Sequence, residues 1–271
     1  MYWIIVRRFS MSKVITVTNQ KGGTGKTSTS LFLSYGLAFK GYKVLLIDLD
    51  SQADASFSTG VKYDETKTSL EVILGDIDIE DTITPVPTKQ DAKIDLIPAS
   101  SNLASLDIQL VKRQLIDAQY NLSEALKPVK NNYDFVVIDT PPAISMAVLN
   151  SLTASDYVIV PTQADIYGLK GLGKLAGTLN SIQRHSNPDI KVLGILLGRY
   201  NYRTNFTKAI TDMLQSTSEK LNTKIFSTKI REAIAIKEAQ GERTNLFEYA
   251  PKAKVTQDVN EFINEVLGGL I

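Results

Sequence analysis

The sequence of 271 residues contains no cysteine and a single histidine, His185. Without cysteine the chain can form no disulfide, no thiolate metal site and no iron–sulfur cluster, and it has no cysteine nucleophile. One histidine cannot build a multi-histidine metal site or a paired-histidine mechanism. Any chemistry must therefore come from other side chains.

The sequence also lacks an apolar run long enough for a membrane-spanning helix. Its first ten residues are apolar with two arginines, but they are too short for a signal peptide with a cleavage site. We expect a cytoplasmic protein in which residues 1–10 are a flexible or upstream extension. Residues 11–271 are expected to form a single domain, because no long linker, repeat or low-complexity segment interrupts them.

The chain also lacks a large net charge, since 30 Lys and Arg against 29 Asp and Glu leave only +1. The distribution is uneven, because residues 184–254 carry 13 Lys and Arg against 7 Asp and Glu, a local excess of +6. Such asymmetry is typical of a segment with an anionic partner, and equally of a solvated basic face.

Apolar runs of strand length alternate with helical stretches along the chain. Several of these strands are continuous rather than alternating apolar runs, which predicts burial on both faces. The expected fold is α/β, a twisted, mostly parallel sheet flanked by helices on both faces. The expected strands are 14–18, 43–48, 94–98, 135–139, 157–161 and 192–197, and the expected helices are 25–39, 103–128, 143–153, 168–184 and 204–220.

A glycine-rich segment, Lys-Gly-Gly-Thr-Gly-Lys-Thr-Ser at residues 21–28, joins the first strand to the first helix. Glycines let backbone N–H groups converge on phosphate oxygens, and the following helix adds its positive N-terminal end. Lys26 can reach the β- and γ-phosphates, and the Thr27 hydroxyl can ligate Mg²⁺. The segment therefore predicts a P-loop NTPase, although Gln20 replaces the first glycine of the usual pattern and Lys21 is an additional lysine. The expected nucleotide-binding residues are Lys21, Gly22, Gly23, Thr24, Gly25, Lys26, Thr27 and Ser28.

Two carboxylates complete the expected chemistry. Asp139 ends the apolar strand Phe-Val-Val-Ile-Asp, at the edge where α/β sheets bind ligands, and could hold Mg²⁺ through water. Asp50 follows the second strand and is suited to orient the attacking water or the metal. Asp48 is the alternative, either as the catalytic carboxylate or as a helix or turn cap, and we favour Asp50. The expected metal ligands are thus Thr27, Asp50 and Asp139, and the cofactors are ATP and Mg²⁺.

The stretch 251–268 has apolar residues at helical spacing. A membrane-surface helix would carry Lys and Arg on its polar face, whereas this one carries Asp258, Glu261 and Glu265. We expect it to dock against the core.

Three motifs together resemble the deviant Walker A, A′ and Walker B motifs of the ParA/MinD ATPases. They are Lys-Gly-Gly-Thr-Gly-Lys-Thr, Leu-Ile-Asp-Leu-Asp-Ser-Gln and Val-Ile-Asp-Thr-Pro-Pro, and the likeness covers about residues 13–268. The resemblance implies that Lys21 reaches the nucleotide of the opposite subunit in an ATP-bound homodimer. It also implies that Lys26 binds phosphate, Thr27 binds Mg²⁺ and Asp50 is needed for hydrolysis, so that Lys21, Lys26 and Asp50 are the expected catalytic residues.

Within that family the sequence is most similar to short, plasmid-encoded ParA-type partition ATPases. The segments that carry this likeness are 96–100, 161–165, 203–205, 230–233 and 246–254. Nitrogenase iron proteins and arsenical pump ATPases depend on cysteines, which are absent here. The resemblance implies a partition ATPase with non-specific DNA and a centromere-binding partition protein as partners, associated with the nucleoid and without a membrane contact.

The basic segment coincides with positions where the family carries DNA-contacting arginines and lysines. We expect Arg203, Arg231 and Lys237 to contact DNA; Arg231 could instead serve the nucleotide, because its segment lines the adenine pocket in the family. The alternative functions are a MinD-like positioning ATPase that acts on a membrane or protein scaffold, and a metabolic synthetase of the same fold.

Overall fold

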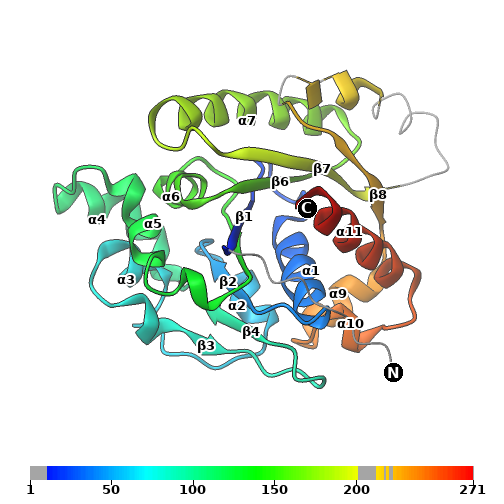
Figure 1. The fold of residues 1–271 in the computed structure, drawn as a ribbon, viewed down its shortest axis with the longest axis horizontal. Coiled ribbons are helices and arrows are strands. Elements are labelled where there is room, and N and C mark those ends of the chain that lie inside the picture. Colours follow the sequence, from blue (N-terminus) through cyan, green and yellow to red (C-terminus); the bar gives the residue numbers. More distant parts are fainter. Residues whose placement is uncertain (1–10, 201–211, 217, 220–221, 271) are drawn as a thin grey trace.

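Eight strands form one sheet in the computed structural model, which describes residues 11–270 except 201–211, 217, 220 and 221 (Figure 1). The strand order is β3-β4-β2-β5-β1-β6-β7-β8, and every neighbouring pair is parallel except β3 and β4. This confirms the expected fold class. The strands are β1 (Lys13–Val17), β2 (Val44–Asp48), β3 (Thr84–Pro85), β4 (Ile94–Ile97), β5 (Phe135–Asp139), β6 (Tyr157–Thr162), β7 (Lys191–Tyr200) and β8 (Ile225–Arg231).

Helices cover both faces of this sheet (Figure 1). On one face α1, α10 and α11 pack against the sheet, and on the other face α3 to α7 do so. The helices are α1 (Lys26–Phe39), α2 (Asp54–Ser58), α3 (Ser69–Leu74), α4 (Leu106–Lys112), α5 (Asn121–Leu126), α6 (Met146–Ala154), α7 (Ile166–His185), α9 (Ile234–Gly241), α10 (Leu246–Tyr249) and α11 (Lys254–Leu270).

The central strands are buried on both faces, as their continuous apolar runs predict. In β5, Phe135 and Val137 join the core under α1 and α11, whereas Val136 and Ile138 join the core on the other side. Successive side chains of a strand point to opposite faces, so a strand between two helical layers needs apolar residues at every position.

The C-terminal helix α11 docks against the core, as expected. Val259, Phe262 and Ile263 have no exposed surface, and Phe262 packs edge-to-face on Phe226 of β8 with 5.2 Å between ring centroids. Within the residues that the structure describes, no helix is both long and apolar enough to cross a membrane.

One expected element is wrong. Residues 103–128 do not form one helix, because the backbone turns left-handed at Gln114 (φ 52°) and Asp117 (φ 60°) between α4 and α5. A left-handed residue cannot continue the hydrogen-bond ladder of a right-handed helix. Strand β8 was not expected at all, since this half-exposed edge strand lacks a continuous apolar run. The expected helix over 204–220 lies largely outside the described residues. Within it the structure describes only 212–216, 218 and 219, and these are helical.

Replacing Phe262 with alanine should lower the free energy of unfolding by about 3–5 kcal/mol, because a fully buried aromatic ring leaves a cavity. Chemical denaturation followed by circular dichroism measures this loss. Ile108→Ala on α4 is the matched control, since the Ile108 side chain is 59% exposed. A Phe262→Ala loss no larger than that of the control would contradict the docking of α11.

Candidate functional site

The register of three neighbouring strands gathers the site at one edge of the sheet. Val17 at the end of β1 pairs with Asp139 of β5, and Asp139 pairs with Asp48 of β2. The glycine-rich loop that follows β1 therefore lies beside the two strand-terminal carboxylates. This is the carboxyl edge of a parallel sheet, where ligands of α/β proteins bind.

The loop itself has the backbone geometry of an anion cradle. Gly23 (φ 72°) and Gly25 (φ 88°) are left-handed, a conformation that residues with a Cβ adopt only with strain. Gly25 precedes α1 without a side-chain cap, and no acidic residue occupies the first turn of that helix. The first backbone N–H groups of α1 are thus open to an anion, and the helix dipole adds positive potential there.

Above the loop is a cavity of about 470 Å³. Lys26 contributes to it while being only 7% exposed, and its Nζ lies 3.5 Å from the carbonyl of Lys21. Burial lowers the pKa of Lys26, and the charges of Asp139 and Asp50 oppose that shift. A phosphate group bound at the loop would therefore compensate the positive charge of the buried Lys26. The cavity is lined by Gly22, Gly23, Gly25, Lys26, Thr27, Ser28, Asp50, Gln52, Asp54, Phe57, Ser58, Pro142, Arg199, Gln240 and Gly241.

Asp139 is fully buried at the end of β5, opposite Val17 at the end of β1. Its Oδ1 accepts a hydrogen bond from the Ser30 hydroxyl at 2.9 Å, and its Oδ2 has no hydrogen-bond partner among the described residues. Burial raises the pKa of Asp139, and the charge of Asp48 raises it further, whereas the hydroxyls of Thr27 and Ser30 and the Lys26 charge lower it. A buried carboxylate oxygen without a partner is a donor atom fit for a hydrated Mg²⁺ beside Thr27.

The two candidate catalytic carboxylates, Asp48 and Asp50, have different surroundings in the structure. Asp48 is fully buried, and its carboxylate accepts hydrogen bonds from the backbone N–H of Asp50 at 3.0 Å and from the backbone N–H and hydroxyl of Ser56, both at 2.8 Å. That is the turn-capping arrangement. Asp50 lines the phosphate-loop cavity. The catalytic role of Asp50 stays a prediction, and its position is compatible with it.

Lys21 is bound within its own chain. Its Nζ donates to both carboxylate oxygens of Asp165, at 2.8 and 3.0 Å, and lies 5.6 Å from the centre of the Tyr167 ring. Asp165 is also the N-cap of α7, where its Oδ1 accepts from the backbone N–H of Gly168 at 2.6 Å. Next to it, the Gln20 amide donates to Thr178 of α7 at 2.7 Å. The start of the loop is thus fastened to α7.

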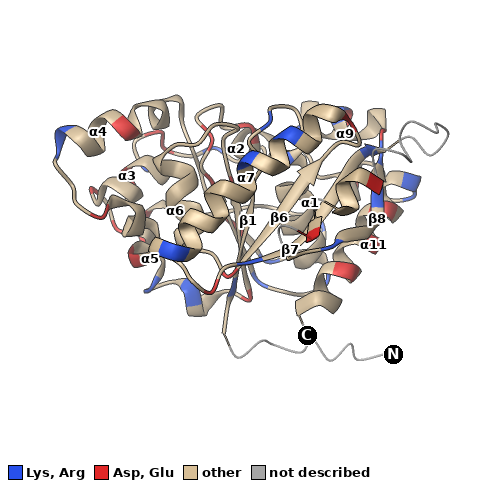
Figure 2. Ribbon diagram, turned by 90° about the horizontal axis from the view of Figure 1, so that it is seen from above, with Lys and Arg blue, Asp and Glu red and all other residues tan. Residues whose placement is uncertain are grey.

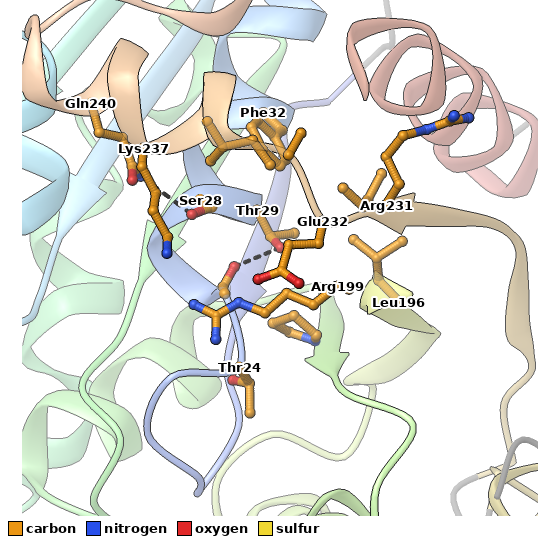
Figure 3. Close-up of a pocket in the computed structure, with 16 residues that line it drawn as sticks. Thr24, Ser28, Thr29, Phe32, Leu196, Arg199, Arg231, Glu232, Lys237 and Gln240 are labelled. Carbon is orange, nitrogen blue, oxygen red and sulfur yellow. Dashed lines mark hydrogen bonds between the residues drawn. The ribbon is translucent and has the colours of Figure 1, made fainter. Parts of the chain in front are cut away.

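A second, smaller cavity of about 100 Å³ adjoins the first (Figure 3). Phe32, Leu196 and Ile230 give it apolar walls, while Arg199 and Glu232 add charged groups. Such a slot suits a flat aromatic base. The two cavities share Gly25, Ser28, Arg199 and Gln240.

The three residues expected to contact DNA, Arg231, Lys237 and Arg203, differ in what the structure shows of them. The backbone of Arg231 lines the smaller cavity, but its guanidinium points toward α11 (Figure 3), where it donates from Nε and Nη2 to Asp258, both at 2.6 Å. Lys237 is exposed at the rim of the same cavity. Arg203 lies outside the described residues. Their roles toward DNA or nucleotide remain predictions.

Among the site residues that were not anticipated from sequence are Asp165, Arg199 and Gln240. The signal for Asp165 was present, since an Asp between a strand and a helix is a favoured N-cap. Arg199 and Gln240 come from the ends of β7 and α9, and no local pattern marks them. Only the tertiary fold brings them to the loop.

Comparisons with known proteins agree with this geometry. Residues 12–192 match a family described as an AAA domain. The chain is 34% identical over 257 residues to the sporulation initiation inhibitor protein Soj of Bacillus subtilis, covering 94% of this chain and 98% of that protein. It is 33% identical over 204 residues to the chromosome partitioning protein ParA of Myxococcus xanthus, covering 75% and 70%. Among solved structures, cobyrinic acid a,c-diamide synthase of Mycobacterium smegmatis with bound ADP and magnesium is 30% identical, with a TM-score of 0.79 and coverage of 95% and 94%.

Two substitutions of Asp165 should differ in their effect on stability. Asp165→Ala removes both the N-cap of α7 and the ion pair, so we expect the free energy of unfolding to fall by about 1–2 kcal/mol. Asp165→Asn keeps a capping oxygen and removes only a partly exposed ion pair, for which the loss should be below about 1 kcal/mol. Urea denaturation without nucleotide measures both. Equal losses would show that the ion pair, and not the cap, carries the effect.

Arg231→Ala should lower the free energy of unfolding by about 2–3 kcal/mol, because the Asp258 side chain is only 8% exposed and would lose its charged partner, keeping only the hydrogen bond from the backbone N–H of residue 231. Lys237→Ala, at an exposed position nearby, is the control and should change stability by less than about 0.5 kcal/mol. Thermal or urea unfolding of the two variants makes the comparison. An unaltered stability for Arg231→Ala would mean that the pair with Asp258 is not maintained in solution.

Proposed function

The chain belongs to the ParA/MinD family of ATPases, as a ParA-type partition member, and we propose that it drives DNA segregation. In this proposal ATP binding dimerises the protein, and the dimer binds DNA without sequence preference. A centromere-binding partner then stimulates hydrolysis, which releases the DNA. The proposal rests above all on the anion cradle at the start of α1, with Lys21 and Lys26 beside it.

Each group at the loop has a role in ATP hydrolysis. The backbone N–H groups and Lys26 would bind the phosphates, and Mg²⁺, held by the Thr27 hydroxyl and by Asp139 through water, would neutralise charge on them. Asp50, which lines the same cavity, would orient the attacking water. Asp48 would act indirectly, because its three hydrogen bonds, from the backbone of Asp50 and from the backbone and hydroxyl of Ser56, hold the segment that carries Asp50.

Lys21 would change partners on dimerisation. Within one chain it is paired with Asp165, and the two side chains are 24% and 31% exposed. A partly exposed ion pair contributes little to stability. Lys21 can therefore leave Asp165 at small cost when a triphosphate of a second subunit offers more negative charge. The proposed ATP-dependent homodimer requires that exchange.

DNA binding is proposed for the basic segment 184–254, with its excess of +6. Figure 2 shows lysines and arginines interspersed with acidic residues on this side of the molecule, so the field there is not uniformly positive. Lys237, which is exposed, is one of the stronger candidates. Arg203, which lies outside the described residues, is the other. Arg231 is the weaker one, because its guanidinium already binds Asp258.

Two rival functions make different predictions. A MinD-like positioning ATPase would bind a membrane or scaffold, and the burial of the apolar face of α11 in the core speaks against α11 as a membrane helix. A synthetase is favoured by the likeness to a structure named as a diamide synthase. Such an enzyme would show turnover stimulated by a small-molecule substrate.

The deciding experiment is binding to non-specific duplex DNA at about physiological salt, with ATP and Mg²⁺, with ADP, and without nucleotide. We expect binding only with ATP, and a steep weakening as salt rises, because phosphate contacts release counterions. Fluorescence anisotropy of a labelled duplex measures this. Lys237→Ala should weaken the ATP-dependent binding by several fold.

Lys26→Ala serves as the control, because it should bind neither ATP nor DNA under any of these conditions. Binding to liposomes without binding to DNA would favour the positioning rival. No nucleotide-dependent DNA binding, together with turnover stimulated by a carboxylic acid substrate and an amide donor, would favour the synthetase.

A further inference from the structure

Two segments that are far apart in the sequence line the phosphate-loop cavity and meet at its rim. One is α2, which follows Asp50 along the chain and places Phe57 in the cavity lining. The other is the end of α9, where Gln240 and Gly241 line the same cavity. Because α9 also lines the smaller, apolar cavity, it is a wall of both compartments. Its distance from α2 therefore affects how far the larger cavity opens.

A cation–π contact joins these two walls. The guanidinium carbon of Arg243, in the turn that follows α9, lies 4.2 Å from the centre of the Phe57 ring. Both side chains are exposed, Phe57 to 50%. The ring face attracts the cation, and at an exposed site this attraction shifts an equilibrium by only about two- to fivefold. The contact can therefore favour the closed arrangement of the walls and still open spontaneously.

The backbone around this contact brings the two turns close together. Gly60, which follows α2, is left-handed (φ 70°), and a Cβ there would meet the carbonyl oxygen of Arg243 at 2.9 Å. Arg243 is itself left-handed (φ 51°), which is uncommon for a residue with a Cβ. This close approach fixes the main chain of Arg243 beside α2 and places its side chain within reach of Phe57.

We propose that Phe57 and Arg243 form a clasp that gates the passage of nucleotide into and out of the site. The closed clasp holds the end of α9 against α2, and nucleotide exchange requires the two to separate. This inference rests on the proposed function, because it requires that a nucleotide binds at the loop. It adds to that function a control of the exchange rate by two residues that act without binding the nucleotide themselves.

A gate of this kind changes rates and leaves affinity unchanged. In this proposal the clasp is closed both before and after a nucleotide binds. A contact that is equally present in two states has no effect on the equilibrium between them. Breaking the clasp therefore raises the rates of nucleotide association and dissociation by the same factor, about two- to fivefold, and keeps the Kd. A residue that binds the nucleotide would instead change the Kd.

The test is stopped-flow fluorescence of the full-length protein with a fluorescent ADP analogue and Mg²⁺, which gives both rate constants. Arg243→Gln removes the cation, and Phe57→Leu removes the ring while keeping an apolar side chain. Each should raise both rate constants about two- to fivefold, and the double variant should show no further increase, because the two changes remove the same contact. Lys62→Gln removes an exposed positive charge from the segment after Gly60 and should keep the rates of the unaltered protein.

The outcomes separate the clasp from the function on which it rests. Unchanged rates in either single variant, or a double variant whose increase is the product of the single increases, would overturn the clasp and leave nucleotide binding standing. Faster dissociation with unchanged association would mean that the altered residue binds the nucleotide directly, which also overturns the clasp. No binding of the ADP analogue by the unaltered protein would overturn the proposed function itself. Circular dichroism of each variant checks that it is folded.

Discussion

The pairing of β5 with both β1 and β2 is the constraint on which the site depends. Asp139 stands opposite Val17 on one side and opposite Asp48 on the other, so three chain segments distant in sequence end at one level. Because the strands are parallel, the phosphate loop, the metal-binding candidate and the turn that carries Asp50 all emerge at the same edge. A register shift of one residue would turn the side chain of Asp139 to the other face of the sheet.

The contacts of the phosphate loop with α7 and α9 could link nucleotide binding to movement of these helices. Gln20 and Lys21 are bound by Thr178 and Asp165 of α7, whereas Ser28 is bound by Gln240 of α9. The loop is therefore held from both sides by helices that are themselves partly exposed. A nucleotide that takes Ser28 as a partner would compete with its contact to Gln240, and a nucleotide of a second subunit that takes Lys21 would break its contact with Asp165. Nucleotide binding would then be coupled to α9, and dimerisation to α7.

Much of this arrangement could be predicted from sequence because its signals are local. The strands 135–139 and 43–48, the helix after the loop and the docked C-terminal helix are each continuous patterns of apolar residues. Two kinds of feature could not be predicted from the sequence. The break between α4 and α5 depends on left-handed residues, Gln114 and Asp117, that are not glycine. Edge strand β8 and the residues Arg199 and Gln240 acquire their place only from tertiary packing, which leaves no local pattern.

The two buried carboxylates of the site, Asp48 and Asp139, explain why the site is suited to bind a cation and a phosphate group together. Asp48 satisfies its charge with backbone and hydroxyl donors, but Asp139 has one oxygen without any donor among the described residues. Two buried carboxylates on adjacent strands repel each other, and Lys26 above them is itself desolvated. Neither the lysine nor the carboxylate is well solvated alone. A divalent cation that arrives with a polyphosphate supplies both missing partners at once, so the metal and the nucleotide should bind this site cooperatively.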